Sequence, residues 1–156
     1  MRANKQILVL LALALLLLPG CGEKEAESPE PAKLYAAICE HADLPEDMAD
    51  MTGELLEDAT GISPEMYESA VYCLVETGLT PDEIAIVKAD DEESAGEIQN
   101  LLEKRLAYKR KAAENYLTEF MPVLKAGTVR RDGLTVSLLV TEDMEGVLSA
   151  FGGISG

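Results

Sequence analysis

An apolar strand that leads directly into a long amphipathic helix is the feature that most constrains the fold of this chain. In residues 82–89 (DEIAIVKA) successive side chains alternate between two faces, as in a β-strand. Residues 92–117 then place small and apolar side chains along one side at helical spacing. These side chains are Ala95, Ile98, Leu102, Leu106, Ala113 and Tyr116. The pattern predicts a sheet that is covered by a long helix.

Alternating or helical patterns in the rest of the chain predict the other elements. Residues 68–77 favour a strand, although Ser63-Pro64-Glu65 could instead begin a helix. Residues 128–131 and 134–140 form a predicted hairpin around Asp132-Gly133, a strong turn signal. Short helices are expected at residues 34–41, around residues 48–56 before Gly61, and at residues 142–151. We therefore expect a single α+β domain, with a small antiparallel sheet of about four strands packed against the long helix.

The acidic run at residues 90–93 (DDEE) directly precedes the long helix. Asp90 and Glu93 have the spacing of a capping box, in which the two side chains bond to the first free backbone N–H groups of a helix. The alternative is a metal site, but the run lacks the glycine and the spaced oxygen ligands of a calcium loop. The sequence therefore favours helix capping.

The amino-terminal residues are typical of a secretory leader. Arg2 and Lys5 precede an unbroken apolar run over residues 7–18, and Pro19-Gly20 follows it. Twelve residues of helix cover roughly 18 Å, well short of the about 30 Å of a bilayer core. The run is thus too short to be a transmembrane helix and is expected to be a cleaved signal peptide.

The end of this leader resembles the lipobox of bacterial lipoproteins. Leu18, Gly20 and Cys21 match the lipobox, whereas Pro19 replaces the usual small residue. The resemblance implies cleavage after Gly20 and transfer of a diacylglyceryl group to the Cys21 thiol. Two acyl chains give a stable membrane anchor, whereas one chain binds only marginally. The alternative is an ordinary signal peptide followed by a coincidental cysteine.

The chain then divides into a leader at residues 1–20, the lipidated Cys21 with a flexible acidic tether to residue 32, one domain at residues 33–152, and a frayed tail at residues 153–156. The tether contains four glutamates and two prolines without apolar periodicity. The 136 residues left after cleavage are enough for one domain of ordinary size. The expected location is the outer face of the cytoplasmic membrane, where the lipid holds the protein.

The charge of the mature chain is strongly negative and unevenly distributed. Cleavage leaves 11 basic and 29 acidic residues, a formal charge of −18. Residues 23–103 hold 23 acids against three lysines, whereas residues 104–131 hold eight bases against two acids. A negative surface opposes binding to nucleic acid and to anionic lipid headgroups. The expected partners are the membrane, through the anchor alone, and either an envelope protein or a cell-wall polymer.

Three residues outside the leader have side chains that could form a disulfide or act as an acid, base or ligand. Cys39 and Cys73 would lie outside the cytoplasm, where a disulfide could join them, but each lies in an apolar segment that suits a free buried thiol. His41, the only histidine, could be an acid, base or ligand. Its position at the end of a predicted helix, without a second histidine, favours a helix-end role. Cys39 and His41 point about 200° apart on a helix and cannot form a nucleophile–base pair.

Several segments together resemble a family known as domain of unknown function 4358. They are DEIAIVKA at residues 82–89, residues 91–94, Arg105 in the long helix, and a late strand opened by Gly133. The chain departs from this family at Leu134, where an aromatic residue is common, and at residues 116–122, where a tighter Tyr-x-Pro arrangement is usual. The likeness covers roughly residues 33–151. It implies a small lipoprotein of Gram-positive bacteria without an assigned activity.

No motif in the chain identifies a reaction, a cofactor or a metal site. The best candidate binding cluster is Glu83, Lys88 and Arg105, since polar groups on a short strand and its covering helix can meet; an ordinary ion pair would explain them equally well. We expect a binding or accessory module rather than an enzyme. The alternatives are a small cell-envelope hydrolase, which needs a deep pocket with convergent polar groups, and a structural spacer.

Overall fold

The protein is a three-layer α+β domain. The computed structural model describes residues 28–53 and 55–154, so the leader, Cys21 and most of the predicted tether lie outside the described residues. One antiparallel sheet forms the middle layer, with the strand order β1-β2-β3-β5-β4. Its strands are β1 (Met48–Asp50), β2 (Tyr67–Val75), β3 (Glu83–Ala89), β4 (Thr128–Asp132) and β5 (Thr135–Val140). The predicted class and the antiparallel sheet are confirmed.

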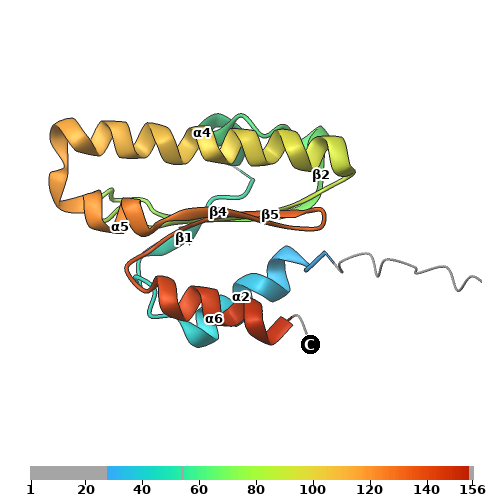
Figure 1. Cartoon of the computed structure of the whole chain (residues 1–156), viewed down its shortest axis with the longest axis horizontal. Helices are drawn as coiled ribbons and strands as arrows, with labels where there is room; N and C mark the ends of the chain where they lie inside the picture. Colours follow the sequence, from blue (N-terminus) through green and yellow to red (C-terminus); the bar gives the residue numbers. More distant parts are fainter. Residues whose placement is uncertain (1–27, 54, 155–156) are drawn as a thin grey trace, which may run out of the picture.

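Helices cover both faces of this sheet (Figure 1). The long α4 (Glu92–Tyr116) lies on one face, and α2 (Pro31–His41) lies beside α6 (Met144–Ile154) on the other. Four short helical segments connect the larger elements. They are α3 (Leu56–Thr60), the 3₁₀ turns η2 (Pro64–Met66) and η3 (Thr118–Phe120), and α5 (Met121–Ala126). The sequence predicted only the covering by the long helix.

The alternation along β3 divides the apolar side chains into two cores. Ala85 and Val87 pack under α4, together with five buried apolar residues of that helix. Ile84 and Ile86 pack on the opposite face with Leu34 of α2 and residues of α6. Because β3 is the central strand, both of its faces are buried. A polar side chain at either end of this strand therefore lies next to buried apolar side chains.

The amino-terminal part of the sheet differs from the prediction. Residues 48–50 form β1 and pair with β2, with Met48 opposite Val75, rather than belonging to a helix. The helical spacing of methionine and leucine wrongly predicted a helix there. The open edge of β2 offers this segment backbone partners, which spacing alone does not reveal. The helix α3 follows, and it ends at Gly61, whose φ of 80° lies in the left-handed region that favours glycine.

Two details of α4 also correct the sequence analysis. The N-cap is Asp91, whose Oδ1 accepts a hydrogen bond from the Ser94 N–H at 2.8 Å, and not Asp90. Tyr116 is 85% exposed, although its spacing placed it on the buried side. Ala113 in the same turn is buried in the core, so the buried side of α4 ends at Ala113.

Residues 28 and 29, which belong to the predicted tether, contact the domain. The Ser28 Oγ accepts a hydrogen bond from the Leu134 N–H at 2.8 Å, and the Thr135 Oγ1 donates one to the Pro29 carbonyl at 2.7 Å. Pro31 occupies the first turn of α2, a position that suits proline because its missing N–H is not needed there. The end of the predicted tether is therefore held against the start of β5.

Candidate functional site

The most unusual side chain in the domain is Glu83, a carboxylate that is 0% exposed at the start of the central strand. It lies on the face of the sheet that α4 covers. Tyr72 of the neighbouring β2, also fully buried, donates its hydroxyl to Glu83 Oε1 at 2.9 Å. Two polar side chains from adjacent strands thus meet beneath the helix.

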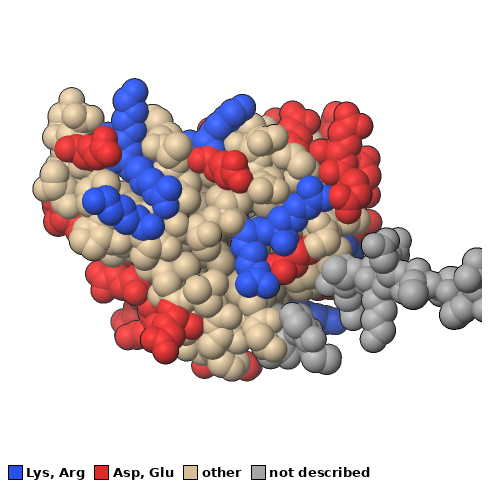
Figure 2. Space-filling view, in the orientation of Figure 1, with Lys and Arg blue, Asp and Glu red and all other residues tan. Residues whose placement is uncertain are grey.

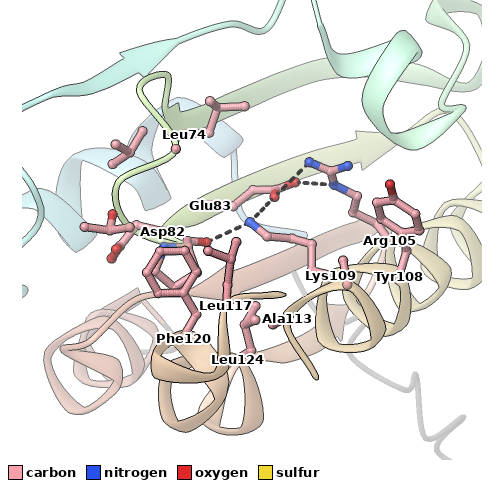
Figure 3. Close-up of a pocket in the computed structure, with 15 residues that line it drawn as sticks. Leu74, Asp82, Glu83, Arg105, Tyr108, Lys109, Ala113, Leu117, Phe120 and Leu124 are labelled. Atoms are coloured by element: carbon pink, nitrogen blue, oxygen red, sulfur yellow. Dashed lines mark hydrogen bonds and ion pairs between the residues drawn. The ribbon is translucent and has the colours of Figure 1, made fainter. Parts of the chain in front are cut away.

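Two cations of α4 complete the pairing of Glu83 (Figure 3). Arg105 donates from Nε to Oε1 at 3.0 Å and from Nη2 to Oε2 at 3.2 Å. Lys109 donates from Nζ to Oε2 at 2.6 Å and to the Pro81 carbonyl at 2.7 Å. Because Arg105 and Lys109 are four residues apart, they lie on the same side of the helix, one turn apart. The network ties α4 to the β2–β3 connection.

This environment holds Glu83 in the ionised form. Burial by itself would raise its pKa, but the charges of Lys109 and Arg105 and their hydrogen bonds outweigh burial and hold the pKa below the ordinary value of 4.5. The pKa of Tyr72 is raised, first by burial and then by the adjacent carboxylate, so its hydroxyl stays protonated and continues to donate. Glu83 is therefore a poor proton acceptor, and it has no proton to give near neutral pH.

A pocket of about 260 Å³ opens beside this network. Leu74 and Val75 come from the end of β2, Arg105 and Lys109 from α4, and Phe120 from the segment that follows α4. The remaining lining residues are Gly78, Thr80, Pro81, Asp82, Glu83, Tyr108, Ala112, Ala113, Leu117 and Leu124. The pocket thus has apolar walls and a charged floor, the usual composition of a binding site.

Two polar atoms in the pocket lining lack a partner. The Thr80 Oγ1 and the Asp82 Oδ1 are buried, and neither has a hydrogen-bond partner within the described part of the chain. Asp82 as a whole is 3% exposed. A buried polar atom without a hydrogen bond costs about 1–3 kcal/mol, so such atoms often mark places where another molecule supplies the missing group.

The structure brings together only two of the three residues in the predicted cluster. Glu83 and Arg105 are paired, but Lys88 lies on the opposite face of the sheet. There it pairs with Glu30 at 2.6 Å and with Glu68 at 2.9 Å. Its inclusion was wrong because five residues separate it from Glu83, and an odd separation along a regular strand places two side chains on opposite faces.

Sequence reasoning missed Tyr72 and Lys109. Lys109 could have been found, because it follows Arg105 at the i+4 spacing that puts two side chains on one side of a helix. Tyr72 could not, because its contact with Glu83 depends on the register in which β2 pairs with β3. A two-residue shift of that register would separate the hydroxyl and the carboxylate.

Cys39 and Cys73 are free thiols in the structure, and a disulfide between them, one of the two alternatives from the sequence, remains a hypothesis. Cys39 is exposed on α2, and Cys73 is buried on β2. Burial raises the pKa of the Cys73 thiol, while its hydrogen bond with Tyr35 acts in the opposite direction. A buried thiol with a raised pKa is a poor nucleophile.

The described residues contain no group of three or more His, Cys, Asp or Glu side chains placed to hold a metal ion. Within residues 28–53 and 55–154, no helix combines the length and the apolar character needed to cross a bilayer. His41 lies at the end of α2, where its Nδ1 is 2.8 Å from the Ala37 carbonyl oxygen.

The protein is thus a small α+β domain of three layers, with an ionic network under α4 and a pocket beside that network. Residues 40–141 match the family described as "Domain of unknown function (DUF4358)", and the chain belongs to this family. No match was found among curated proteins or among solved structures. The family resemblance seen in the sequence is thereby confirmed, and it assigns no activity.

Proposed function

We propose that this protein is a lipid-anchored binding module at the outer face of the cytoplasmic membrane, and that the pocket beside Glu83 is its binding site. The observation that carries the binding role is the pocket itself, with apolar walls, a fixed charged floor and two unpartnered buried polar atoms. The anchor rests on the leader and on Cys21 in the sequence.

The geometry of the domain suits a pocket that faces away from the bilayer. Residues 22–27 separate Cys21 from Ser28, which contacts the domain, and six residues reach at most about 20–22 Å. Ser28 contacts Leu134 beside the β4–β5 turn, and Arg131 of that hairpin pairs with Glu92 at the start of α4. The Lys109 end of the pocket is 17 residues further along α4, about 25 Å away. A short tether would hold the first end near the membrane and leave the pocket outward.

The chemistry of Glu83 favours binding over hydrolysis. A general acid needs a raised pKa, and a general base needs a free lone pair within reach of a substrate. The Glu83 pKa is lowered, and its two oxygens already accept four hydrogen bonds. An inert spacer is also disfavoured, because it would not need a pocket rimmed by exposed aromatic and aliphatic side chains.

Position-specific crosslinking in cells tests this proposal. A photoreactive amino acid replaces Tyr108 at the pocket rim, and the control carries it at Leu148, an exposed apolar residue of α6 on the opposite side of the sheet. Mass spectrometry of the protein isolated from membranes should find a diacylated Cys21. Adducts to another envelope component should form from position 108 and not from position 148.

The proposal fails on either of two results. An unmodified Cys21 thiol, or a leader that is still attached, would contradict the anchored location. Adducts that form from position 148 and not from position 108 would contradict the assignment of the pocket as the binding site.

A further inference from the structure

The exposed apolar side chains of the domain gather around the pocket. Five large apolar side chains are strongly exposed among the described residues: Leu79, Tyr108, Tyr116, Leu117 and Leu148. Tyr108 and Leu117 line the pocket, Leu79 lies between the lining residues Gly78 and Thr80, and Tyr116 precedes Leu117. Only Leu148 lies elsewhere. A concentrated apolar rim with tyrosines is typical of protein interaction sites, in which such residues often dominate the binding energy.

The size of the pocket limits what can enter it. Sites for small molecules and cofactors usually have volumes of about 300–1,000 Å³. The 260 Å³ found here lies below that range. It suits a single apolar side chain that projects from a larger partner, while the exposed rim contacts the residues on either side of that side chain.

Two lysines of α4 add positive charge near the pocket, whereas the chain as a whole is strongly acidic. Lys104 and Lys111 lie on the same side of α4 as Tyr108, at spacings of four and three residues. Neither ammonium group belongs to any ion pair within the described part of the chain. Figure 2 shows Lys and Arg side chains, with Asp and Glu side chains among them, over the end of the molecule formed by the last turns of α4 and by α5. Such a rim attracts acidic residues.

We infer that the pocket binds a segment of another protein that carries one apolar side chain between acidic residues. The apolar side chain would fill the space between Leu74, Phe120 and Leu124. The acidic residues would face Lys104 and Lys111. This inference rests on the proposed binding role of the same pocket and adds the chemistry of its partner.

Selection from a random peptide display library tests the inference. The full chain, purified in detergent and immobilised, should enrich peptides that share one large apolar residue with acidic neighbours. Ala112→Phe should fill the pocket mouth and weaken the binding of these peptides at least about tenfold, a loss of about 1.4 kcal/mol. Ala107→Phe is the matched control, since Ala107 is also exposed on α4 but does not line the pocket, and it should leave the affinity within about twofold.

Charge reversal tests the acidic part of the inference. The Lys104→Glu, Lys111→Glu double variant should weaken binding about tenfold at low salt, and the difference from wild type should shrink as salt is added. Lys33→Glu, on α2 and thus on the opposite face of the sheet, should have little effect. Circular dichroism establishes that each variant remains folded before its affinity is measured.

Three results would overturn the inference. The selection could enrich no common sequence, or the selected peptides could still bind Ala112→Phe. In the third case, no peptide binds, while an anionic polymer or anionic vesicles bind the wild type and not Ala112→Phe. Failure of this inference and failure of the proposed function give different experimental results. A protein without its lipid anchor would still select the same peptides, whereas in-cell adducts to a polymer from position 108 would support the pocket and refute the peptide segment.

Discussion

Neutralising Glu83 should destabilise the domain more than any other single charge change in it. Glu83→Gln keeps the size of the side chain and one oxygen acceptor but removes the negative charge between Arg105 and Lys109. Removing one partner of a buried ion pair typically costs about 3–5 kcal/mol. The two cations keep 21% and 18% exposure, so water can partly hydrate them. We therefore expect a loss of about 2–4 kcal/mol in the free energy of unfolding.

Urea denaturation at pH 7, followed by circular dichroism, measures this loss. A domain of this size changes its Tm by roughly 3–5 °C per kcal/mol, so a drop of about 10 °C should accompany the loss. Glu97→Gln is the control, because Glu97 is exposed on the same helix and makes no ion pair among the described residues. A loss below about 1 kcal/mol for Glu83→Gln would refute the reasoning, since exposed pairs contribute that little.

The other predictions concern pH, close packing and thiol access. Because the folded pKa of Glu83 is depressed, its stabilisation is present above the unfolded value near 4.5 and is lost as pH falls through the folded pKa, so the wild-type advantage over Glu83→Gln in Tm should shrink below pH 4.5. Gly146→Ala should cost about 1–3 kcal/mol in urea denaturation, because the new Cβ would lie 2.5 Å from the His41 carbonyl oxygen where α6 meets α2; unchanged stability would contradict this close approach. Under native conditions an alkylating reagent should modify Cys39 rapidly and Cys73 only after unfolding. Protection of both thiols until a reductant is added would instead indicate a disulfide.

The elements with a strong internal pattern were predictable from the sequence. The alternation in residues 82–89 predicted the strand and both of its faces. Gly61 at the end of α3 and Gly133 in the β4–β5 turn have positive φ values, 80° and 60°, which favour glycine. The long helix ends within a residue of its predicted limit. These features depend on local spacing and on backbone preferences, which a single sequence carries.

The features that depend on tertiary contacts were not predictable. Residues 48–50 form a strand only because the edge of β2 is available to them, and residues 28–30 are held only because β5 begins beside them. Only some residues of the site were predicted. Glu83 and Arg105 were identified as polar groups on an apolar strand and its helix, but Tyr72 depends on the strand register and the pocket depends on how residues 117–124 fold back against α4.

We propose that partners bind at the pocket beside the Glu83 network. Amide NMR spectra of the full chain, recorded with and without a peptide selected on it, locate the binding surface. We expect shift changes confined to residues 74–83 and 105–124, which include the lining of the pocket, and their loss in Ala112→Phe. Changes centred on α2 and α6 around Leu148, or changes that persist in Ala112→Phe, would contradict it.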